Sequence, residues 1–281
     1  MTDERPVLDV SVVVPTRDAE AVIDDCLASV VSARPRELIV VDGLSTDRTL
    51  ELVRRHPVTA TLSDEGTGLP NARMIGARLA SSRWVALVDA DVVLPEGALA
   101  ELLEEAERER YTALQAGLCS VAGPGYWGQA LVQHHRSGRS KDWFGVAATV
   151  FEREALLRHG FDPRFRSGED IDLRWRLRRA GARVAVSRRT VVIHRFGDSF
   201  AFARAQWVAD GRGLARLVRK HRWRGAWIAL LPLASSVYGS ALALRRREPK
   251  WLPYYAAFAA YNYAAMLRGL VARGRTDGAQ V

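Results

Sequence analysis

The chain has 281 residues, of which 48% are hydrophobic and 26% are charged, with 22 Gly and 11 Pro. This composition excludes collagen-like, low-complexity and wholly disordered chains, and the length suits one large domain or one domain with an appendage of about a hundred residues. The formal net charge of +9 favours nucleic acid, anionic lipid or phosphorylated substrates as partners.

Strand and helix patterns alternate through the first 110 residues. Short apolar runs closed by Pro, Gly or Asp predict buried strands, and apolar residues at helical spacing predict helices. The predicted strands are 10–15, 38–41, 58–62 and 84–88, and the predicted helices are 20–33, 47–55, 70–80 and 95–110. Continuous apolar strands separated by helices are typical of an α/β fold with a mostly parallel central sheet flanked by helices.

The second half of the chain is less regular. We expect strands at 113–122, 146–151, 184–186 and 191–194, and helices at 152–160 and 169–181. A basic helix at 200–221 follows. Then come an almost uncharged segment at 226–244, which as a helix is about 28 Å long, and an aromatic one at 251–267, with Arg245, Arg246 and Arg247 between them. Pro232 and Gly239 weaken a full membrane span, so we expect an interfacial or re-entrant helical pair at a membrane. The alternative is a soluble packing or dimer face.

The two cysteines, Cys26 and Cys119, cannot form a disulfide framework and match no zinc spacing. Both have apolar neighbours, which predicts buried, reduced thiols in a cytosolic protein. The N-terminal stretch MTDERPVLD is acidic and lacks the apolar run of a signal peptide. His134 and His135, a weaker candidate pair, are expected to be solvated.

Polar residues follow the predicted strands, at the edge where α/β sheets bind ligands. Asp89 and Asp91 flank one alanine after the fourth strand, and their hard oxygens suit Mg²⁺ or Mn²⁺ bridging two phosphates. His194 either completes that metal site with Asp91 or is structural. Asp42, after the second strand, can accept a hydrogen bond from a nucleobase or ribose, although its loop also reads as a turn and helix cap.

Two further candidates lie on predicted helices. Arg73 either binds a phosphate or pairs with the strand-end aspartates. Glu169 and Asp170 open a helix, where they either cap it or supply a general base for a hydroxyl. The chain has no G-x-G-x-x-G after its first strand, no P-loop and no G-x-S-x-G, which disfavours dinucleotide-binding Rossmann enzymes, P-loop NTPases and α/β-hydrolases.

In order and spacing, several segments resemble the family 2 glycosyltransferases of GT-A fold. The matching segments are VSVVVPTRDAE at 10–20, IVVDGLSTDRT at 39–49, GLPNARMIGARLASSRWVALVDADV at 68–92, FEREALLRHGFDPRF at 151–165 and GEDIDLRWRLRRAG at 168–181. The resemblance implies a nucleotide-diphosphate sugar donor, a Mn or Mg cation and inversion at the sugar carbon.

By position, the resemblance also implies roles for individual residues. The implied donor-binding residues are Pro15, Thr16, Arg17, Asp18, Asp42, Arg73 and Asp89. Asp91, Asp89 and His194 are the implied metal ligands, and Asp170 is the implied catalytic base with Glu169 beside it. Arg17 and Asp18 stand where the family often has Tyr-Asn, so Arg17 is expected to stack on the donor base through its guanidinium.

The Gln-x-x-Arg-Trp motif of processive synthases is missing, which favours transfer of a single sugar. We therefore predict a GT-A glycosyltransferase domain at 1–200 and a membrane-associating region at 201–281, on the cytoplasmic side of the cell membrane or in the cytoplasm. The expected acceptor is a glycan or a lipid-linked molecule in envelope glycan or glycolipid synthesis, and nucleic acid is not expected as a partner.

Two alternatives remain. A sugar-phosphate nucleotidyltransferase shares an α/β nucleotide-binding core, but it usually carries a basic glycine-rich loop after the first strand, where this chain has PTRDAE. A noncatalytic basic module at a membrane surface explains the charge but not the ordered carboxylates.

Overall fold

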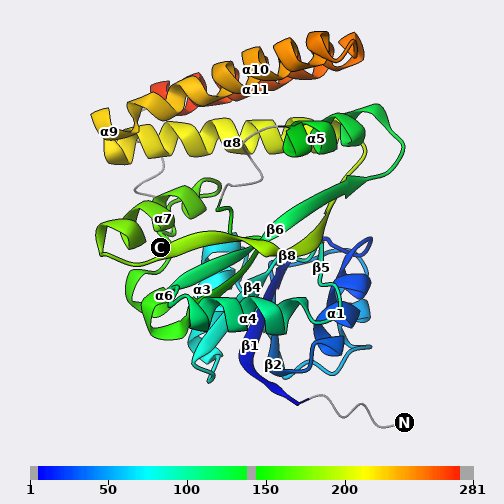
Figure 1. Ribbon diagram of the computed structural model, residues 1–281, viewed down its shortest axis with the longest axis vertical. Coiled ribbons are helices and arrows are strands. Elements are labelled where there is room, and N and C mark those ends of the chain that lie inside the picture. The colour runs from blue at the N-terminus through cyan, green and yellow to red at the C-terminus, as the bar shows by residue number, and fades with distance from the viewer. Residues whose placement is uncertain (1–5, 138–143, 273–281) are drawn as a thin grey trace. The chain divides into compact units, whose positions relative to one another are not determined.

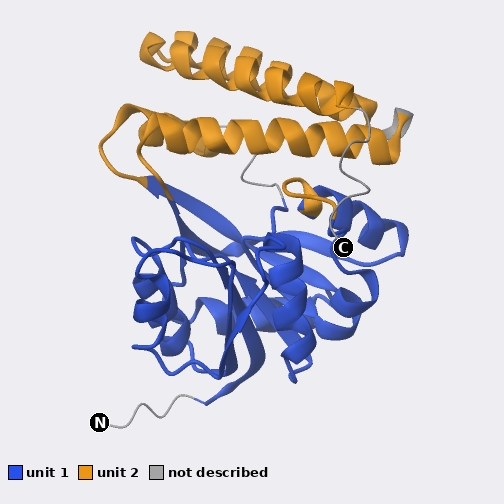
Figure 2. Cartoon of the chain, turned by 180° about the vertical axis from the view of Figure 1, so that it is seen from behind, with its two compact units in different colours: residues 1–121, 139–163, 170–195 blue, residues 122–138, 164–169, 196–281 orange. Residues whose placement is uncertain are grey.

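The computed structural model describes residues 6–137 and 144–272 (Figure 1). Residues 1–5 of the acidic N-terminal stretch and 273–281 of the predicted C-terminal region lie outside the described residues. The chain forms two compact units (Figure 2). The sheet unit comprises 1–121, 139–163 and 170–195, and the helical unit comprises 122–138, 164–169 and 196–281. The division into domains 1–200 and 201–281 stays a prediction.

An eight-stranded mixed sheet has the order β3-β2-β1-β4-β7-β6-β8-β5. Its strands are β1 (Leu8–Thr16), β2 (Pro35–Asp42), β3 (Ala60–Ser63), β4 (Trp84–Val88), β5 (Val92–Val93), β6 (Ala113–Ala122), β7 (Ala148–Glu152) and β8 (Val184–Phe196). The first four strands are parallel, as the sequence predicts, whereas β7 runs antiparallel to both β4 and β6, and β5 runs antiparallel to β8.

Helices cover both faces of the sheet. They are α1 (Ile23–Ser32), α2 (Thr49–Val53), α3 (Leu69–Leu79), α4 (Ala98–Arg108), α6 (Arg153–His159) and α7 (Glu169–Arg179). Alternate residues of β1 enter two different cores: Val12 and Val14 pack with α1 and α4, and Val13 packs with α3, α6 and α7. Both faces of the strand are therefore apolar, which explains its continuous hydrophobic sequence.

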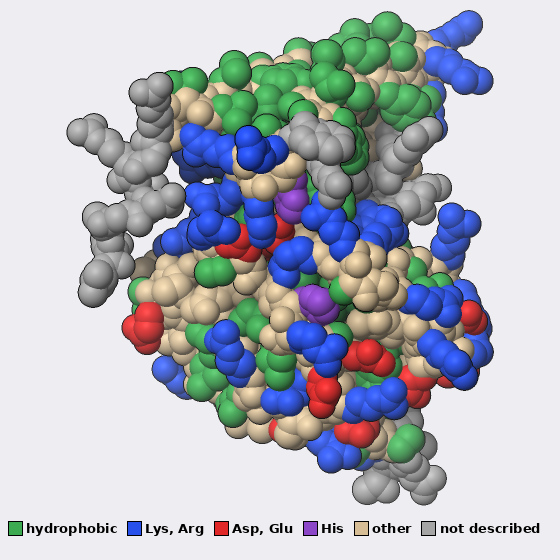
Figure 3. Space-filling view, turned by 90° about the vertical axis from the view of Figure 1, so that its left-hand side faces the viewer, with side chains coloured by type: hydrophobic (Ala, Val, Ile, Leu, Met, Phe, Trp, Pro, Cys, Tyr) green, Lys and Arg blue, Asp and Glu red, His purple; other side chains and the backbone are tan. Residues whose placement is uncertain are grey.

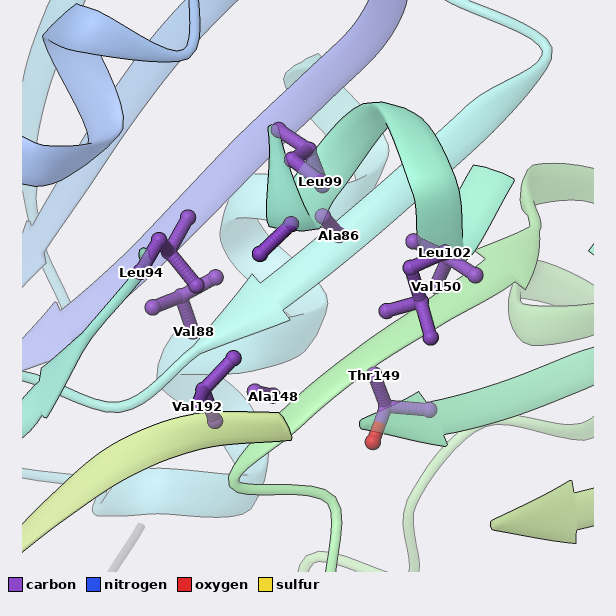
Figure 4. A pocket seen from close by; sticks show the side chains of 10 residues that line it. Ala86, Val88, Leu94, Leu99, Leu102, Ala148, Thr149, Val150 and Val192 are labelled. Carbon is purple, nitrogen blue, oxygen red and sulfur yellow. The ribbon is translucent and has the colours of Figure 1, made fainter. Parts of the chain in front are cut away.

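A small cavity lies inside the core beneath α4 (Figure 4). Its volume is about 10 Å³, and its lining includes Leu99 of α4, which lies beside Ala86 of β4. Such a small and mostly apolar space offers too few polar partners to hold a water molecule, so we treat it as a packing void.

The helical unit consists of α5 (Tyr126–Ser137), α8 (Phe200–His221), α9 (Trp223–Ala226), η2 (Trp227–Leu230), α10 (Leu231–Arg245), η3 (Pro249–Trp251) and α11 (Leu252–Val271). Trp207 of α8 is buried against Tyr254 of α11, in a core that Leu131 of α5 completes. A Cβ on Gly211 of α8 would lie 2.3 Å from the carbonyl oxygen of Asn262, so a glycine is required where α8 and α11 meet.

Two expected strands are in fact one. Residues 184–186 and 191–194 both belong to β8, which also includes the polar residues between them. There the hydroxyl of Ser187 accepts hydrogen bonds from the backbone N–H groups of Arg189 and Thr190, so it satisfies two local donors. Helix α5 was not predicted at all.

The structure also corrects three side-chain expectations. Cys26 is buried, but Cys119 is exposed, because the side-chain alternation of β6 directs it outward. His134 and His135 are half-buried among aromatic side chains: His134 packs against Tyr254 and Phe258, and His135 packs against Phe196. Burial lowers the pKa of His134 to about 4, so this side chain is a neutral part of the aromatic core.

Helix α3 approaches β1 closely at Gly76, where a Cβ would lie 2.2 Å from Cγ1 of Val13. We expect Gly76→Ala to lower the free energy of unfolding by about 1–2 kcal/mol, because overpacking outweighs the gain in helix propensity. Urea denaturation measures the change. Leu79→Ala, on the exposed face of the same helix, is the matched control and should cost less than the glycine replacement. An equal or smaller loss for Gly76→Ala would contradict the close approach.

Candidate active site

The first group of candidate residues lies at the carboxyl ends of β1 and β2. Thr16 stands opposite Asp42 in the parallel register, one step beyond Pro15 and Val41. The N–H of Gly43 donates to the carbonyl of Thr16 at 2.8 Å. The hydroxyl oxygen of Thr16 is buried without a hydrogen-bond partner among the described residues, which leaves a polar group available to a ligand at this edge.

Asp42 is buried and anchors the loop that follows β2. Its two carboxylate oxygens accept hydrogen bonds from the N–H and the hydroxyl of Ser45, at 3.0 and 2.5 Å. Asp18 ties the loop after β1 to this loop, because its N–H donates to Ser45 and its carboxylate accepts from the N–H of Thr46. A carboxylate has about four acceptor positions, so Asp42 retains capacity for a ligand donor.

Arg17 lies over the glycine of this loop and is largely exposed. A Cβ on Gly43 would lie 3.3 Å from Cβ of Arg17, so the glycine leaves room for the arginine. The guanidinium is within 3.7 Å of Asp18. Both side chains are thus held beside Asp42, where the resemblance places a donor base.

Asp64 organises the loop before α3, and the sequence analysis did not identify it. Its buried carboxylate accepts hydrogen bonds from the N–H groups of Gly66 and Gly68, at 2.8 and 2.7 Å, and its own N–H donates to the carbonyl of Asp42. The signal was an Asp two residues before a glycine, a typical Asx-turn pattern. This loop fixes where α3 begins, and therefore where Arg73 lies.

Arg73 is fully buried and pairs with Asp89. Its Nη2 donates to Oδ1 of Asp89 at 2.7 Å, and its guanidinium lies over the ring of Phe161. The sequence left phosphate binding and aspartate pairing open, and the structure contains the aspartate pair. Burial raises the pKa of Asp89, Arg73 opposes this shift, and Asp91 adds to it.

Asp91 and His194 are neighbours at the end of β4. Strand β5 pairs with β8 so that Val92 stands opposite His194, and the His194 Nε2 lies 3.4 Å from Oδ2 of Asp91. Burial alone lowers the pKa of His194, but the hydrogen bond and charge of Asp91, with Asp89 beyond it, outweigh burial and raise the pKa. The other Asp91 oxygen, Oδ1, is buried without a hydrogen-bond partner in the described part of the chain.

These two side chains fit a divalent cation. Within residues 6–137 and 144–272, no group of three or more His, Cys, Asp or Glu side chains is arranged to hold a metal ion. Carboxylate and imidazole suit Mn²⁺, and Mg²⁺ and Mn²⁺ commonly take their remaining ligands from phosphates and water. The free oxygen of Asp91 is the observation that favours this fit.

Glu169 and Asp170 open α7 after a tight turn. Gly168 has φ of +80°, a conformation that favours glycine, and its neighbour Ser167 packs against α8: a Cβ on Gly213 would lie 2.5 Å from the Ser167 carbonyl oxygen. Glu169 is buried and Asp170 is half-buried. The helix start at residue 169 is as the sequence predicts, and both carboxylates lie at a helix N-terminus that stabilises negative charge.

A further carboxylate, Asp210 of α8, was missed by the sequence analysis. It forms a hydrogen bond with Ser167 and is electrostatically coupled to Glu169. The Asp210 side chain is exposed on one side, but the protein around it displaces water from the carboxylate. This desolvation and the negative charge of Glu169 raise the pKa of Asp210 to about 6, and the hydrogen bond with Ser167 opposes the rise. The sequence signal for close packing of this part of α8 is the pair of glycines just after Asp210, Gly211 and Gly213.

The structure therefore gathers the predicted residues into three groups. Pro15, Thr16, Arg17, Asp18 and Asp42 form the first, Arg73, Asp89, Asp91 and His194 form the second, and Glu169 and Asp170 form the third. The role of each residue stays a prediction.

Comparisons with known proteins identify the family of the chain. Residues 11–158, more than half of the chain, match the Glycosyl transferase family 2. The chain is 26% identical over 248 residues to the succinoglycan biosynthesis protein ExoA of Rhizobium meliloti strain 1021, covering 80% of this chain and 74% of that protein.

Two solved structures illustrate the similarity of fold. The mannosyltransferase PcManGT of Pyrobaculum calidifontis, in complex with GDP-Man and Mn²⁺, aligns with a TM-score of 0.69 at 22% identity over 96% of this chain and 89% of that one. The glucosyl-3-phosphoglycerate synthase of Mycobacterium tuberculosis, in complex with Mn²⁺, UDP and phosphoglyceric acid, aligns with a TM-score of 0.54 at 21% identity over 75% of this chain and 77% of that one. The fold is that of the GT-A glycosyltransferases.

The geometry at Asp91 predicts the effect of removing its charge. We expect Asp91→Asn to abolish Mn²⁺-dependent binding of nucleotide-diphosphate sugars, because an amide is a poorer ligand for a hard cation. Calorimetric titration of UDP- and GDP-sugars, with and without Mn²⁺, measures the effect. Asp9→Asn, at the exposed start of β1, is the matched control and should bind as wild type. Equal metal-dependent binding by Asp91→Asn and wild type would exclude a metal role for Asp91.

Proposed function

Because the chain belongs to the Glycosyl transferase family 2, we propose that it transfers one sugar from a nucleotide-diphosphate sugar to an acceptor hydroxyl, with inversion at the sugar carbon. The observation that carries the proposal is the continuous cluster of Arg73, Asp89, Asp91 and His194 at the end of β4. The family match also favours this function over a nucleotidyltransferase or a noncatalytic module. Similarity to the succinoglycan protein ExoA supports an acceptor in envelope glycan synthesis.

The donor binds across the carboxyl ends of β1, β2 and β4. Asp42 accepts hydrogen bonds from the base or ribose, and Arg17 stacks on the base. Asp91 and His194 would hold Mn²⁺ or Mg²⁺, and Asp89 lies beside them, fixed by Arg73. When bound, the cation supplies positive charge that stabilises the leaving diphosphate. GDP-Man and Mn²⁺ accompany the mannosyltransferase of the same fold, which supports this assignment.

The acceptor hydroxyl is activated by Asp170. A hydroxyl has a high pKa, so the carboxylate gains the proton as the new bond to the anomeric carbon forms. Attack opposite to the leaving diphosphate inverts the configuration at that carbon. Glu169, the buried neighbour, orients the acceptor and does not take its proton.

We expect Asp170→Asn to lower the transfer rate by about 10²–10⁴-fold while donor affinity stays near wild type, because the amide keeps the shape but loses the basic lone pair. Single-turnover transfer and donor titration measure the two quantities. Glu169→Gln should lower transfer less, and Glu154→Gln, at an exposed position of α6, is the control.

Three outcomes would contradict the assignment to Asp170. They are a wild-type transfer rate for Asp170→Asn, abolition of transfer by Glu169→Gln alone, and loss of donor binding in Asp170→Asn, which would indicate a role toward the donor. Comparison of thermal melting curves separates each result from a loss of folding.

We further propose that the helical unit binds the cytoplasmic surface of the cell membrane. Among the described residues, one helix, Trp227–Arg245, is long and apolar enough to cross a membrane. Six of its large apolar side chains have exposed fractions between 51% and 62%: Trp227, Leu230, Leu233, Val237, Tyr238 and Leu244. Figure 3 shows hydrophobic side chains spread over the helical unit, at the top of the view.

The charge pattern favours an interfacial helix over a span. Arg245, Arg246 and Arg247 follow the apolar stripe directly and are exposed. If α10 and α11 both crossed the bilayer, these arginines would face away from the cytoplasm, against the positive-inside tendency. Lying in the interface, the helix buries its apolar face while the arginines contact anionic headgroups.

Helix α11 is part of the core of the helical unit, so deletion of 226–281 is not a suitable test of membrane binding. The deletion would remove Tyr254 and Tyr255 from the core around Trp207, and a loss of binding could then result from misfolding. We expect the triple variant Leu230→Gln/Leu233→Gln/Val237→Gln to bind anionic vesicles at least about tenfold more weakly in flotation assays, because each change removes apolar area.

A matched control places the same chemical change elsewhere. Val7→Gln/Leu79→Gln/Val191→Gln replaces three exposed apolar residues of the sheet unit and should leave vesicle binding unchanged. If wild type does not float with vesicles, or if the two triple variants behave alike, the proposed membrane surface is wrong.

A further inference from the structure

A second, larger cavity lies in the sheet unit between α7 and the start of β8. Its volume is about 200 Å³, enough for several water molecules and hence for a phosphate or carboxylate group. Phe144, Val184, Ala185 and Val186 form its apolar wall. The remaining lining residues are three arginines, Arg174, Arg178 and Arg188.

The arginines come from two elements that meet at the cavity. Arg174 and Arg178 are one turn apart on the same face of α7, and Arg188 lies on β8. The beginning of β8 and α7, at the left of Figure 1, are turned toward the viewer in Figure 3, where Lys and Arg side chains are numerous. Residues 144, 174, 178 and 184–188 all belong to the sheet unit, so one folded body builds the cavity.

The three cavity arginines differ in their charged neighbours. Desolvation and the neighbouring Arg178 cation lower the pKa of Arg174, and Asp170 partly opposes them. No ion pair joins Arg178 or Arg188 to a carboxylate within the described residues. Arg178 and Arg188 are exposed, so solvent screens their charges, and the concave surface between them leaves room for an anion.

Packing explains a different arginine of the same helix. Arg176 forms an ion pair with buried Asp172 at 2.8 Å and donates to the carbonyls of His159 and Gly160, so it closes the end of α6. Arg174 and Arg178 lie two positions away on either side and line the cavity instead. The helix thus carries one arginine that joins elements of the fold and two that line the cavity.

The cavity begins close to the proposed base. Asp170, Arg174 and Arg178 follow one another at intervals of four residues, so their backbone positions lie on one face of α7 at about 6 Å and 12 Å from Asp170 along the axis. One or two sugar rings span such distances. A group bound among the arginines can therefore belong to a molecule whose hydroxyl lies at Asp170.

We propose that Arg174, Arg178 and Arg188 form an anion subsite that binds an acidic group, a phosphate or a carboxylate, of the acceptor. The inference rests on the proposed function, which supplies the acceptor hydroxyl at Asp170. Arginine suits this task because its planar fork binds oxyanions through two parallel hydrogen bonds. The subsite selects acceptors that carry negative charge one or two sugar lengths from the reacting hydroxyl.

Titration with inorganic pyrophosphate tests the subsite. The full chain is titrated calorimetrically at constant ionic strength, with EDTA present so that no metal binds at Asp91. Arg178→Gln/Arg188→Gln should weaken pyrophosphate binding at least about tenfold, because each charge-assisted hydrogen bond contributes substantially. The matched control, Arg179→Gln/Arg189→Gln, removes the same charge from adjacent exposed positions that do not line the cavity and should bind as wild type.

Two results overturn the proposal: wild type does not bind pyrophosphate, or both double variants lose affinity equally, which would indicate general electrostatic attraction. Farnesyl phosphate and glucose 6-phosphate, titrated in the same way, distinguish a lipid-linked from a soluble phosphate. If neither compound binds, the subsite is contradicted as well. Donor hydrolysis by wild type with Mn²⁺, measured separately, tests the proposed function. Its failure alongside a positive pyrophosphate titration would reject transfer while retaining the anion site.

Discussion

The candidate site depends on one buried ion pair, that between Arg73 and Asp89. A guanidinium with almost no exposure is tolerated in a protein only when a carboxylate or equivalent acceptor meets it, because an unpaired buried charge costs several kcal/mol. The pair joins α3 to the end of β4. Asp91 and His194 lie next to it, so the ion pair sets the position of the cluster on which the functional proposal rests.

The distribution of charge around this pair forms a consistent pattern. Carboxylates at the ends of β2 and β4 would repel a nucleotide diphosphate unless cations stand among them. Arg73 is one such cation, and a divalent ion at Asp91 and His194 would be another. Beside α7 lie instead Arg178 and Arg188, which have no carboxylate partner in the described part of the chain. The proposed donor and acceptor sites thus lie in differently charged parts of the sheet unit.

Glycines determine how closely the elements approach. Gly76 brings α3 against β1, and Gly211 brings α8 against α11. Gly213 lets the Ser167 carbonyl rest on α8, and Gly168 turns the chain into α7. In each case a Cβ would clash or be strained, so backbone geometry at the site is fixed by the absence of a side chain. Substitution there would displace functional residues without touching them.

The sequence by itself determined the parallel half of the sheet, the GT-A fold and the place of Asp42, Asp89 and Asp170, because these depend on local apolar runs and on short motifs at strand or helix ends. Only the tertiary structure decided that Arg73 pairs with Asp89 and that His194 meets Asp91, and it alone revealed the arginine cavity. These features depend on the antiparallel pairing of β5 with β8, across about a hundred residues, and on the packing of α7 against β8. The repeat of apolar residues along a segment does not determine such register. It depends on which contacts between distant segments bury apolar area and pair buried charges at the same time.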